Sequence, residues 1–192
     1  MKTPVAIAAG VFSWPTCGAI AFGLLPRDGW AMATLLIVYH SKTGGSRAMA
    51  LAAAEGGRAE GAVVLKQAAE AGPGDLLTAD GYLFCGPENL AAIAGVMKDF
   101  FDRAYYPVLG RIEGRPYAQM VCAGSDGQNA ARQVARIATG WRLKPVQPPL
   151  ILCTHAQTPE AIAAPKTIPP DGLAQCRDLG QALTAGLSMG AF

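Results

Sequence analysis

Five short apolar runs, separated by glycine-marked turns and helical segments, constrain the fold of this chain more than any other feature of its sequence. Most of the runs are continuous instead of strictly alternating in polarity, which is typical of strands covered on both faces. Segments with apolar residues at three- and four-residue spacing lie between them, as in amphipathic helices. Strand and helix in alternation predict a parallel α/β sheet. We expect its strands at 34–39, 62–67, 81–86, 117–124 and 150–154.

The helical segments are less uniform than the strands. The spacing predicts helices over 46–57, 95–106 and 127–141, whereas the segment between 67 and 80 has room for only a short helix. The last helix should begin at Asp171 as its cap, after two prolines, and run to about Leu187.

Residues 1–31 differ from the rest of the chain. No charge lies between Lys2 and Arg27, and residues 5–25 are long enough to cross a bilayer, which takes about 20 apolar residues. A signal or membrane anchor is therefore one interpretation. A single Lys before the apolar span, and proline and glycine within it, favour the other: translation starts at Met32, or the segment is a tail. We expect residues 32–192 to form one domain.

Charge and cysteine usage exclude several classes. From Met32 onward 14 basic and 13 acidic residues remain of the 16 and 14 in the chain, without a basic run, so we expect no nucleic-acid partner. The five cysteines show no CxxC spacing and read as buried residues in a reducing, cytoplasmic compartment. Neither His40 nor His155 has another ligand at metal-binding spacing, so we expect no metal.

The polar stretch "HSKTGGSR", residues 40–47, follows the first predicted strand and begins the first predicted helix. Sheets of this kind bind ligands at the carboxyl ends of their strands, where the strand order switches direction. Backbone N–H groups of residues 43–46 can converge there on an anion at the positive end of the helix. An ordinary capped turn is the alternative, and the arginine either adds charge or points into solvent. The candidate phosphate ligands are Ser41, Thr43, Gly44, Gly45, Ser46 and Arg47.

Three segments resemble the flavodoxin-like family. "SKTGGS" resembles the loop with which that family holds the phosphate of FMN. "GPENLAAIAGVMKDFFDR", residues 86–103, resembles the segment after the third strand in NADPH-dependent FMN reductases and related NAD(P)H quinone oxidoreductases, where a loop edges the flavin ring. "CAGSDGQNAARQ", residues 122–133, resembles the family's third flavin loop. The resemblance implies flavin contacts from Pro87, Glu88, Asn89, Leu90, Gly124, Ser125, Asp126 and Gly127.

The resemblance implies a flavodoxin-like three-layer sandwich, with a five-stranded parallel sheet in the order 2-1-3-4-5 and helices on both faces. It implies FMN as cofactor, NAD(P)H as reductant and a small-molecule electron acceptor such as a quinone or a flavin. The nearly neutral core and the lack of an aromatic in the loop at 68–74 favour an oxidoreductase over the alternative, an electron carrier of the flavodoxin type. A homodimer remains open, and membrane contact is expected only if residues 1–31 are an anchor.

Several residues and segments have more than one interpretation. Glu88 and Asp126 either tune the flavin ring or cap a helix. His40 either donates a proton or is a hydrogen-bonded structural ring, which a lone histidine at a strand end favours. The segment 105–117 shapes an acceptor pocket, contacts a second subunit or packs its own tyrosines on the surface. The proline-rich segment 155–170 is an ordered excursion or a lid.

Overall fold

A computed structural model describes residues 32–192. The alternatives for residues 1–31, a signal, an anchor or a mis-assigned start, lie outside the described residues. Among residues 32–192, no helix combines the length and the hydropathy that a membrane-spanning helix needs.

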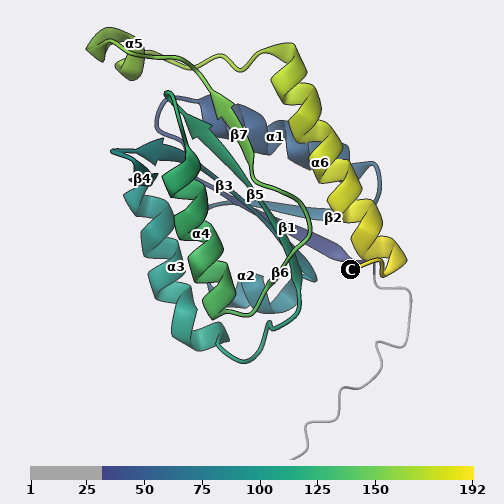
Figure 1. The fold of residues 1–192 in the computed structure, drawn as a ribbon. Coiled ribbons are helices and arrows are strands. Elements are labelled where there is room, and N and C mark those ends of the chain that lie inside the picture. The colour runs from purple at the N-terminus through teal and green to yellow at the C-terminus, as the bar shows by residue number, and fades with distance from the viewer. Residues whose placement is uncertain (1–31) are drawn as a thin grey trace, which may run out of the picture. The chain divides into compact units, whose positions relative to one another are not determined.

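One sheet forms the centre of the domain (Figure 1). Parallel strands run in the order β2, β1, β3, β5, and the outer edge of β5 pairs with both β6 and β7. The predicted order 2-1-3-4-5 is therefore confirmed, with two extra strands of two residues each. The strands are β1 (Thr34–Tyr39), β2 (Ala62–Gln67), β3 (Gly81–Asn89), β4 (Ala92–Ile93), β5 (Pro116–Ala123), β6 (Lys144–Pro145) and β7 (Leu150–Cys153).

Helices cover both faces of the sheet, as Figure 1 shows. Successive residues of a strand point to opposite faces; thus Leu36 and Phe84 pack under α2, α3 and α4, while Leu35 and Leu83 pack under α1 and α6. This double burial is why the strands read as continuous apolar runs. The helices are α1 (Gly45–Arg58), α2 (Pro73–Thr78), α3 (Gly95–Val108), α4 (Gln128–Gly140), α5 (Pro159–Ala163) and α6 (Pro170–Met189).

Three expectations need correction. The last helix, α6, begins at Pro170 with Pro169 before it, so Asp171 lies in its first turn and is not its cap. The segment 87–89 is not a loop: it continues β3, and β4 pairs back on it antiparallel, Glu88 with Ile93 and Asn89 with Ala92. The connection from α3 to β5 lies at the amino ends of the strands, so it does not shape a pocket at their carboxyl ends. There Tyr105 stacks on the buried Trp141 at a centroid distance of 5.8 Å.

Candidate functional site at the carboxyl edge of the sheet

The amino end of α1 is open to an anion. Gly44 is the residue before the helix, with φ of 94°, and its own N–H donates to Ser41 Oγ at 3.1 Å. The first α1 N–H with a backbone acceptor is that of Ala48, which donates to Gly44 O at 2.9 Å. Among the described residues, no acceptor meets the N–H groups of Gly45, Ser46 and Arg47. Three unpaired donors at the positive end of a 14-residue helix have the geometry to bind an anion.

Side chains below this turn are tightly packed. A Cβ on Gly45 would lie 2.6 Å from Cys122 Sγ and 3.2 Å from Lys166 Cβ, so only glycine fits. The Ser46 side chain is fully buried, and its hydroxyl has no hydrogen-bond partner of good geometry among the described residues. Burial raises the pKa of the neighbouring Cys122 thiol, and a contact with the Ser46 hydroxyl partly opposes this shift. A thiol is a weak partner, so a buried hydroxyl with this contact, beside three unpaired N–H groups, is consistent with a phosphate site.

A hairpin tip follows β3 at the same edge. Leu90 and Ala91 connect β3 to β4 with φ of 51° and 57°, and Leu90 is fully exposed. Positive φ at both central residues is the geometry of a tight hairpin turn, and it strains residues other than glycine. Two α4 side chains hold the hairpin: Asn129 Nδ2 donates to Ala91 O at 2.6 Å, and Gln133 Oε1 accepts from Ile93 N at 2.8 Å.

Two carboxylates of the protein accept hydrogen bonds from the loop after β5. Glu88 Oε2 accepts from Gly127 N at 3.0 Å, and Asp126 Oδ2 accepts from Gln128 N at 3.3 Å. Both carboxylates therefore cap α4, as one of the two interpretations held. Glu88 Oε1 is buried and has no hydrogen-bond partner in the described part of the chain. Two carboxylates therefore accept from the amino end of α4, whereas no carboxylate accepts from the amino end of α1 among the described residues.

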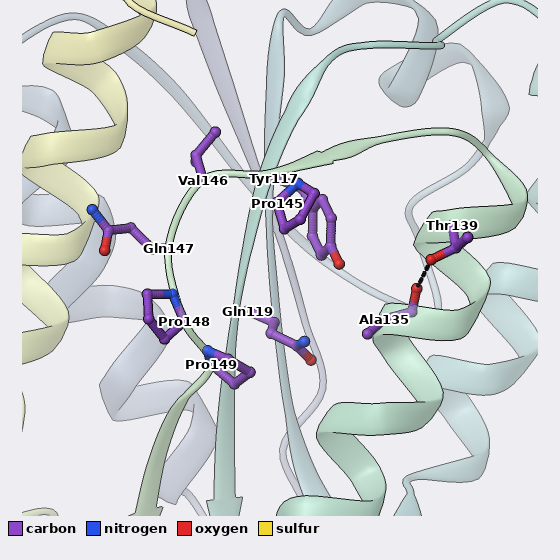
Figure 2. A pocket seen from close by; sticks show the side chains of 9 residues that line it. All are labelled: Tyr117, Gln119, Ala135, Thr139, Pro145, Val146, Gln147, Pro148 and Pro149. Carbon is purple, nitrogen blue, oxygen red and sulfur yellow. Dashed lines mark hydrogen bonds between the residues drawn. The ribbon is translucent and has the colours of Figure 1, made fainter.

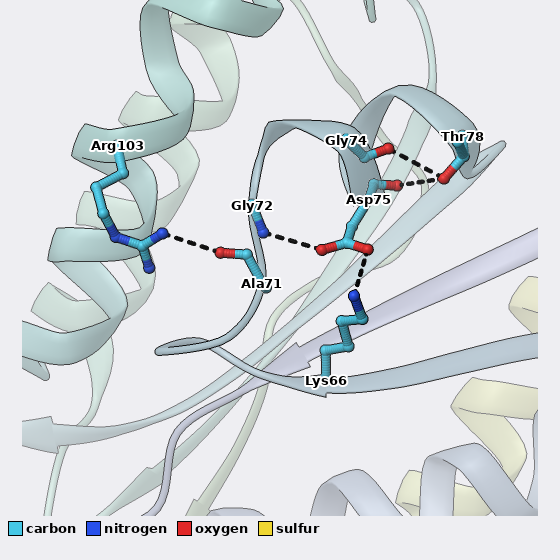
Figure 3. Close-up of polar contacts among 7 residues, drawn as sticks. All are labelled: Lys66, Ala71, Gly72, Gly74, Asp75, Thr78 and Arg103. Carbon is cyan, nitrogen blue, oxygen red and sulfur yellow. Dashed lines mark hydrogen bonds and ion pairs between the residues drawn. The ribbon is translucent and has the colours of Figure 1, made fainter.

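The loop after β2 is rigid and carries no aromatic side chain. Arg103 of α3 donates to Ala68 O at 2.8 Å and to Ala71 O at 3.1 Å. Asp75 accepts from Gly72 N at 2.9 Å and pairs with Lys66 Nζ at 2.6 Å (Figure 3). These contacts hold the loop without a ring that could stack on a ligand.

A strap formed by residues 154–168 crosses the first and third loops. Lys166 N donates to Thr43 O at 2.7 Å, and Thr154 N donates to Ala123 O at 2.9 Å. A Cβ on Gly124 would lie 3.5 Å from Ala156 O, and Ile168 is buried. The predicted excursion over the surface is therefore ordered and lies against the loop of residues 40–47.

The basic side chains of the first loop are exposed, and His40 is half-buried. Lys42 and Arg47 are exposed and have no ion-pair partner among residues 32–192. His40 donates its backbone N–H to Cys85 O at 3.0 Å, and burial lowers the pKa of its ring, which favours the neutral form near pH 7.

The structure thus brings the three predicted loops together at the ends of neighbouring strands. Sequence reasoning did not assign the strap residue Lys166 or the two hairpin clamps Asn129 and Gln133. Asn129 and Gln133 have a sequence signal in principle, because both are polar and lie in the first two turns of the helix that follows the loop after β5. No local pattern marks Lys166, whose partner is far away in the sequence.

Comparisons with known proteins agree with this architecture. No family model matches the chain. A flavodoxin of Aquifex aeolicus (strain VF5) is 36% identical over 108 residues, 54% of this chain and 56% of that protein, so the match spans about half of the curated relative.

Solved structures share the fold at low identity. A flavodoxin from the domain Archaea superposes with a TM-score of 0.65 and 16% identity, over 80% of this chain and 98% of that one. The flavodoxin, WrbA-like protein from Agrobacterium tumefaciens gives 0.61 and 18%, over 82% and 98%. Rubredoxin oxygen:oxidoreductase from Desulfovibrio gigas gives 0.66 and 14%, over 82% and 37%. Residues 32–192 therefore have a flavodoxin-like fold.

Proposed function

We propose that this chain binds FMN and uses it to pass electrons from NAD(P)H to a quinone, a flavin or a similar small acceptor. The open amino end of α1 carries the proposal. It lies beside β1, from which the chain goes outward to β2 and then back past β1 to β3, the switch point where such sheets bind ligands.

The residues of the first loop fit a phosphate monoester. Backbone N–H groups of Gly45, Ser46 and Arg47 have no other acceptor among the described residues, and the orphan hydroxyl of Ser46 adds a donor. Lys42 and Arg47 contribute positive charge from solvent. At the α4 terminus, Glu88 and Asp126 accept from the N–H groups of Gly127 and Gln128, so two carboxylates lie where an anion would have to approach.

The hairpin and the third loop would hold the isoalloxazine ring. Leu90 offers an exposed apolar side chain at the rim, and Glu88 Oε1 offers an unmet acceptor to a ring N–H. FMN, when bound, supplies the hydride and electron chemistry. The chain's own residues bind the phosphate, orient the ring and set the local charge, and we name no catalytic acid or base.

The charge balance supports an enzyme over a carrier. An electron carrier that finds its partner by charge needs a strong field of one sign, and the 14 basic and 13 acidic residues from Met32 onward nearly cancel. A nearly neutral domain can bind a small uncharged acceptor without needing a charged surface to attract it.

An electron carrier is the second candidate, because the relative from Aquifex aeolicus is called a flavodoxin and is 36% identical over the matched region. A carrier also binds FMN but does not itself oxidise NAD(P)H. The two candidates therefore differ in one observable reaction.

The test uses the full chain, reconstituted with FMN and desalted, with NADH or NADPH then added under argon. Retained flavin absorbance that bleaches supports the oxidoreductase, and retained absorbance that stays unbleached supports the carrier. Thr43→Asp places a carboxylate against the phosphate and should abolish retention, whereas Thr43→Asn has the same size without the charge and should preserve it. Equal retention by both variants would remove the phosphate-loop assignment.

A further inference from the structure

The outer edge of the sheet is broken where β6 ends and β7 begins. β6 pairs with Pro116 and Tyr117 of β5, and β7 pairs with the stretch from Met120 to Ala123. The chain between them leaves the sheet because Pro148 and Pro149 have no N–H to donate to a ladder. The edge strand is therefore divided into β6 and β7. We call residues 146–149, which lie between them, the detached segment.

A recess of about 500 Å³ lies between this detached segment and α4 (Figure 2). Its floor is β5, one wall is formed by prolines 145, 148 and 149, and the other wall carries Ala135 and Thr139 of α4. No charged side chain lines it. The fixed φ of the prolines makes that wall stiff, so the recess is preformed and not dependent on a ligand.

Two polar side chains enter the recess from the same face of β5. Gln119 is 4% exposed, and its Oε1 has no hydrogen-bond partner in the described part of the chain. Tyr117, two residues earlier, is also 4% exposed, and no hydrogen bond of its hydroxyl is found among the described residues. Figure 2 shows both side chains in the space between the proline wall and α4.

Such an unmet buried carboxamide oxygen is uncommon, because buried polar side chains nearly always have partners. A packing role would be served as well by leucine, without an unsatisfied acceptor. Gln119 and Tyr117 together offer acceptor and donor groups in an apolar, uncharged frame, which is the composition of a small-molecule site.

We propose that this recess binds a small, planar, uncharged aromatic molecule that carries a carboxamide or a similar group with both a donor and an acceptor. The Gln119 carboxamide would turn its covered Oε1 toward the ligand N–H, and the ligand ring would lie against the prolines and Tyr117. The site is separate from the proposed FMN site, because Tyr117 lies near the amino end of β5 and the third loop follows its carboxyl end.

The test is an NMR titration of the isotope-labelled full chain with benzamide as the probe and benzoate as its charged counterpart. Benzamide should shift the side-chain amide signals of Gln119 and saturate at a dissociation constant on the order of 1 mM, the range expected for so small a ligand. Benzoate, which would bury a charge in an uncharged recess, should bind at least tenfold more weakly.

Three variants locate the probe. Gln119→Leu removes the acceptor and should weaken benzamide binding at least fivefold. Ala135→Leu fills the recess from the exposed side of α4 and should abolish binding even if Gln119→Leu does not fold. Gln175→Leu makes the same chemical change on α6, behind the detached segment, and should leave binding unchanged. Unsaturated shifts, equal binding of benzoate, or undiminished binding by Ala135→Leu would overturn the proposal.

Discussion

The backbone N–H of Lys166 donates a 2.7 Å hydrogen bond to the carbonyl oxygen of Thr43. This contact joins the strap to the loop that we assign to the phosphate, so the strap forms one wall of the proposed site. The Lys166 ammonium also closes the carboxyl end of α5, donating to Ala161 O at 2.6 Å, Ala164 O at 2.7 Å and Ile162 O at 2.9 Å. One residue therefore organises the strap and attaches it to the loop.

Replacing Lys166 by methionine should loosen the strap. The carbonyls of α5 would turn to water, so the free energy of unfolding should fall by less than about 1 kcal/mol. Amide exchange of residues 159–164 should accelerate, and FMN should dissociate up to about fivefold faster, the factor that corresponds to about 1 kcal/mol. Lys166→Arg keeps the donors and should restore both. Lys144→Met, at an exposed lysine whose ammonium has no hydrogen-bond or ion-pair partner in the described part of the chain, is the control. An unchanged FMN dissociation rate would separate the strap from the site.

Ser46→Ala should affect stability and binding in opposite directions. The variant removes a buried hydroxyl whose side-chain contact is a weak one to the Cys122 thiol, so the protein without flavin should be as stable as the wild type or up to about 1 kcal/mol more stable. FMN affinity should fall at least about tenfold, because a hydrogen bond to a charged phosphate is lost. Denaturant titration and flavin binding measure the two effects.

Thr184→Ala is the matched control for Ser46→Ala. Thr184 is equally buried, but its hydroxyl donates to Gly180 O at 3.0 Å. This variant should lose about 1 kcal/mol of stability and keep its FMN affinity. If Ser46→Ala behaves in the same way, Ser46 is a structural residue and does not contact the phosphate.

Glu88→Gln should leave the fold intact, because the remaining amide oxygen still accepts from Gly127 N. It removes a negative charge beside the proposed ring position, which makes added electrons more favourable. The reduction potential of bound FMN should therefore rise, on the order of 30 mV for a two-electron couple. Spectroelectrochemistry measures it. An unmoved potential would limit Glu88 to capping α4.

Gly45→Ala should destabilise the protein even without flavin. The new Cβ would meet Cys122 Sγ at 2.6 Å within a packed core, and overpacking of this kind costs about 1–3 kcal/mol. Gly95, the first residue of α3, has nothing within 4 Å of its would-be Cβ, so Gly95→Ala should change stability by less than about 0.5 kcal/mol. Equal unfolding midpoints for the two variants would contradict the packing described around Gly45.

The elements that sequence reasoning predicted are those whose signal is local. β1 was predicted at residues 34–39 and lies there, because a strand buried on both faces is a continuous apolar run. The strand order followed from the resemblance carried by "SKTGGS" and not from the runs, since apolar runs do not say which strands are neighbours.

Backbone geometry and contacts between distant parts of the chain could not be predicted from local sequence patterns. The turn at Leu90 and Ala91 contains no glycine, although both residues have positive φ, so it carried no turn signal and β3 appeared to end early. The attachment of Lys166 to Thr43 joins two backbone atoms, which leave no trace in residue type. Glu88 and Asp126 were correctly placed at the edge, and only the geometry shows that both cap α4.

The most direct test of the account compares FMN with riboflavin, which has the same ring and no phosphate, in an equilibrium fluorescence titration of the full chain. If the amino end of α1 holds the phosphate, FMN should bind at least about 100-fold more tightly, a difference of roughly 2.7 kcal/mol from charge-assisted hydrogen bonds. Equal affinity for the two flavins, or no binding of either, would contradict the assignment of residues 41–47 to FMN.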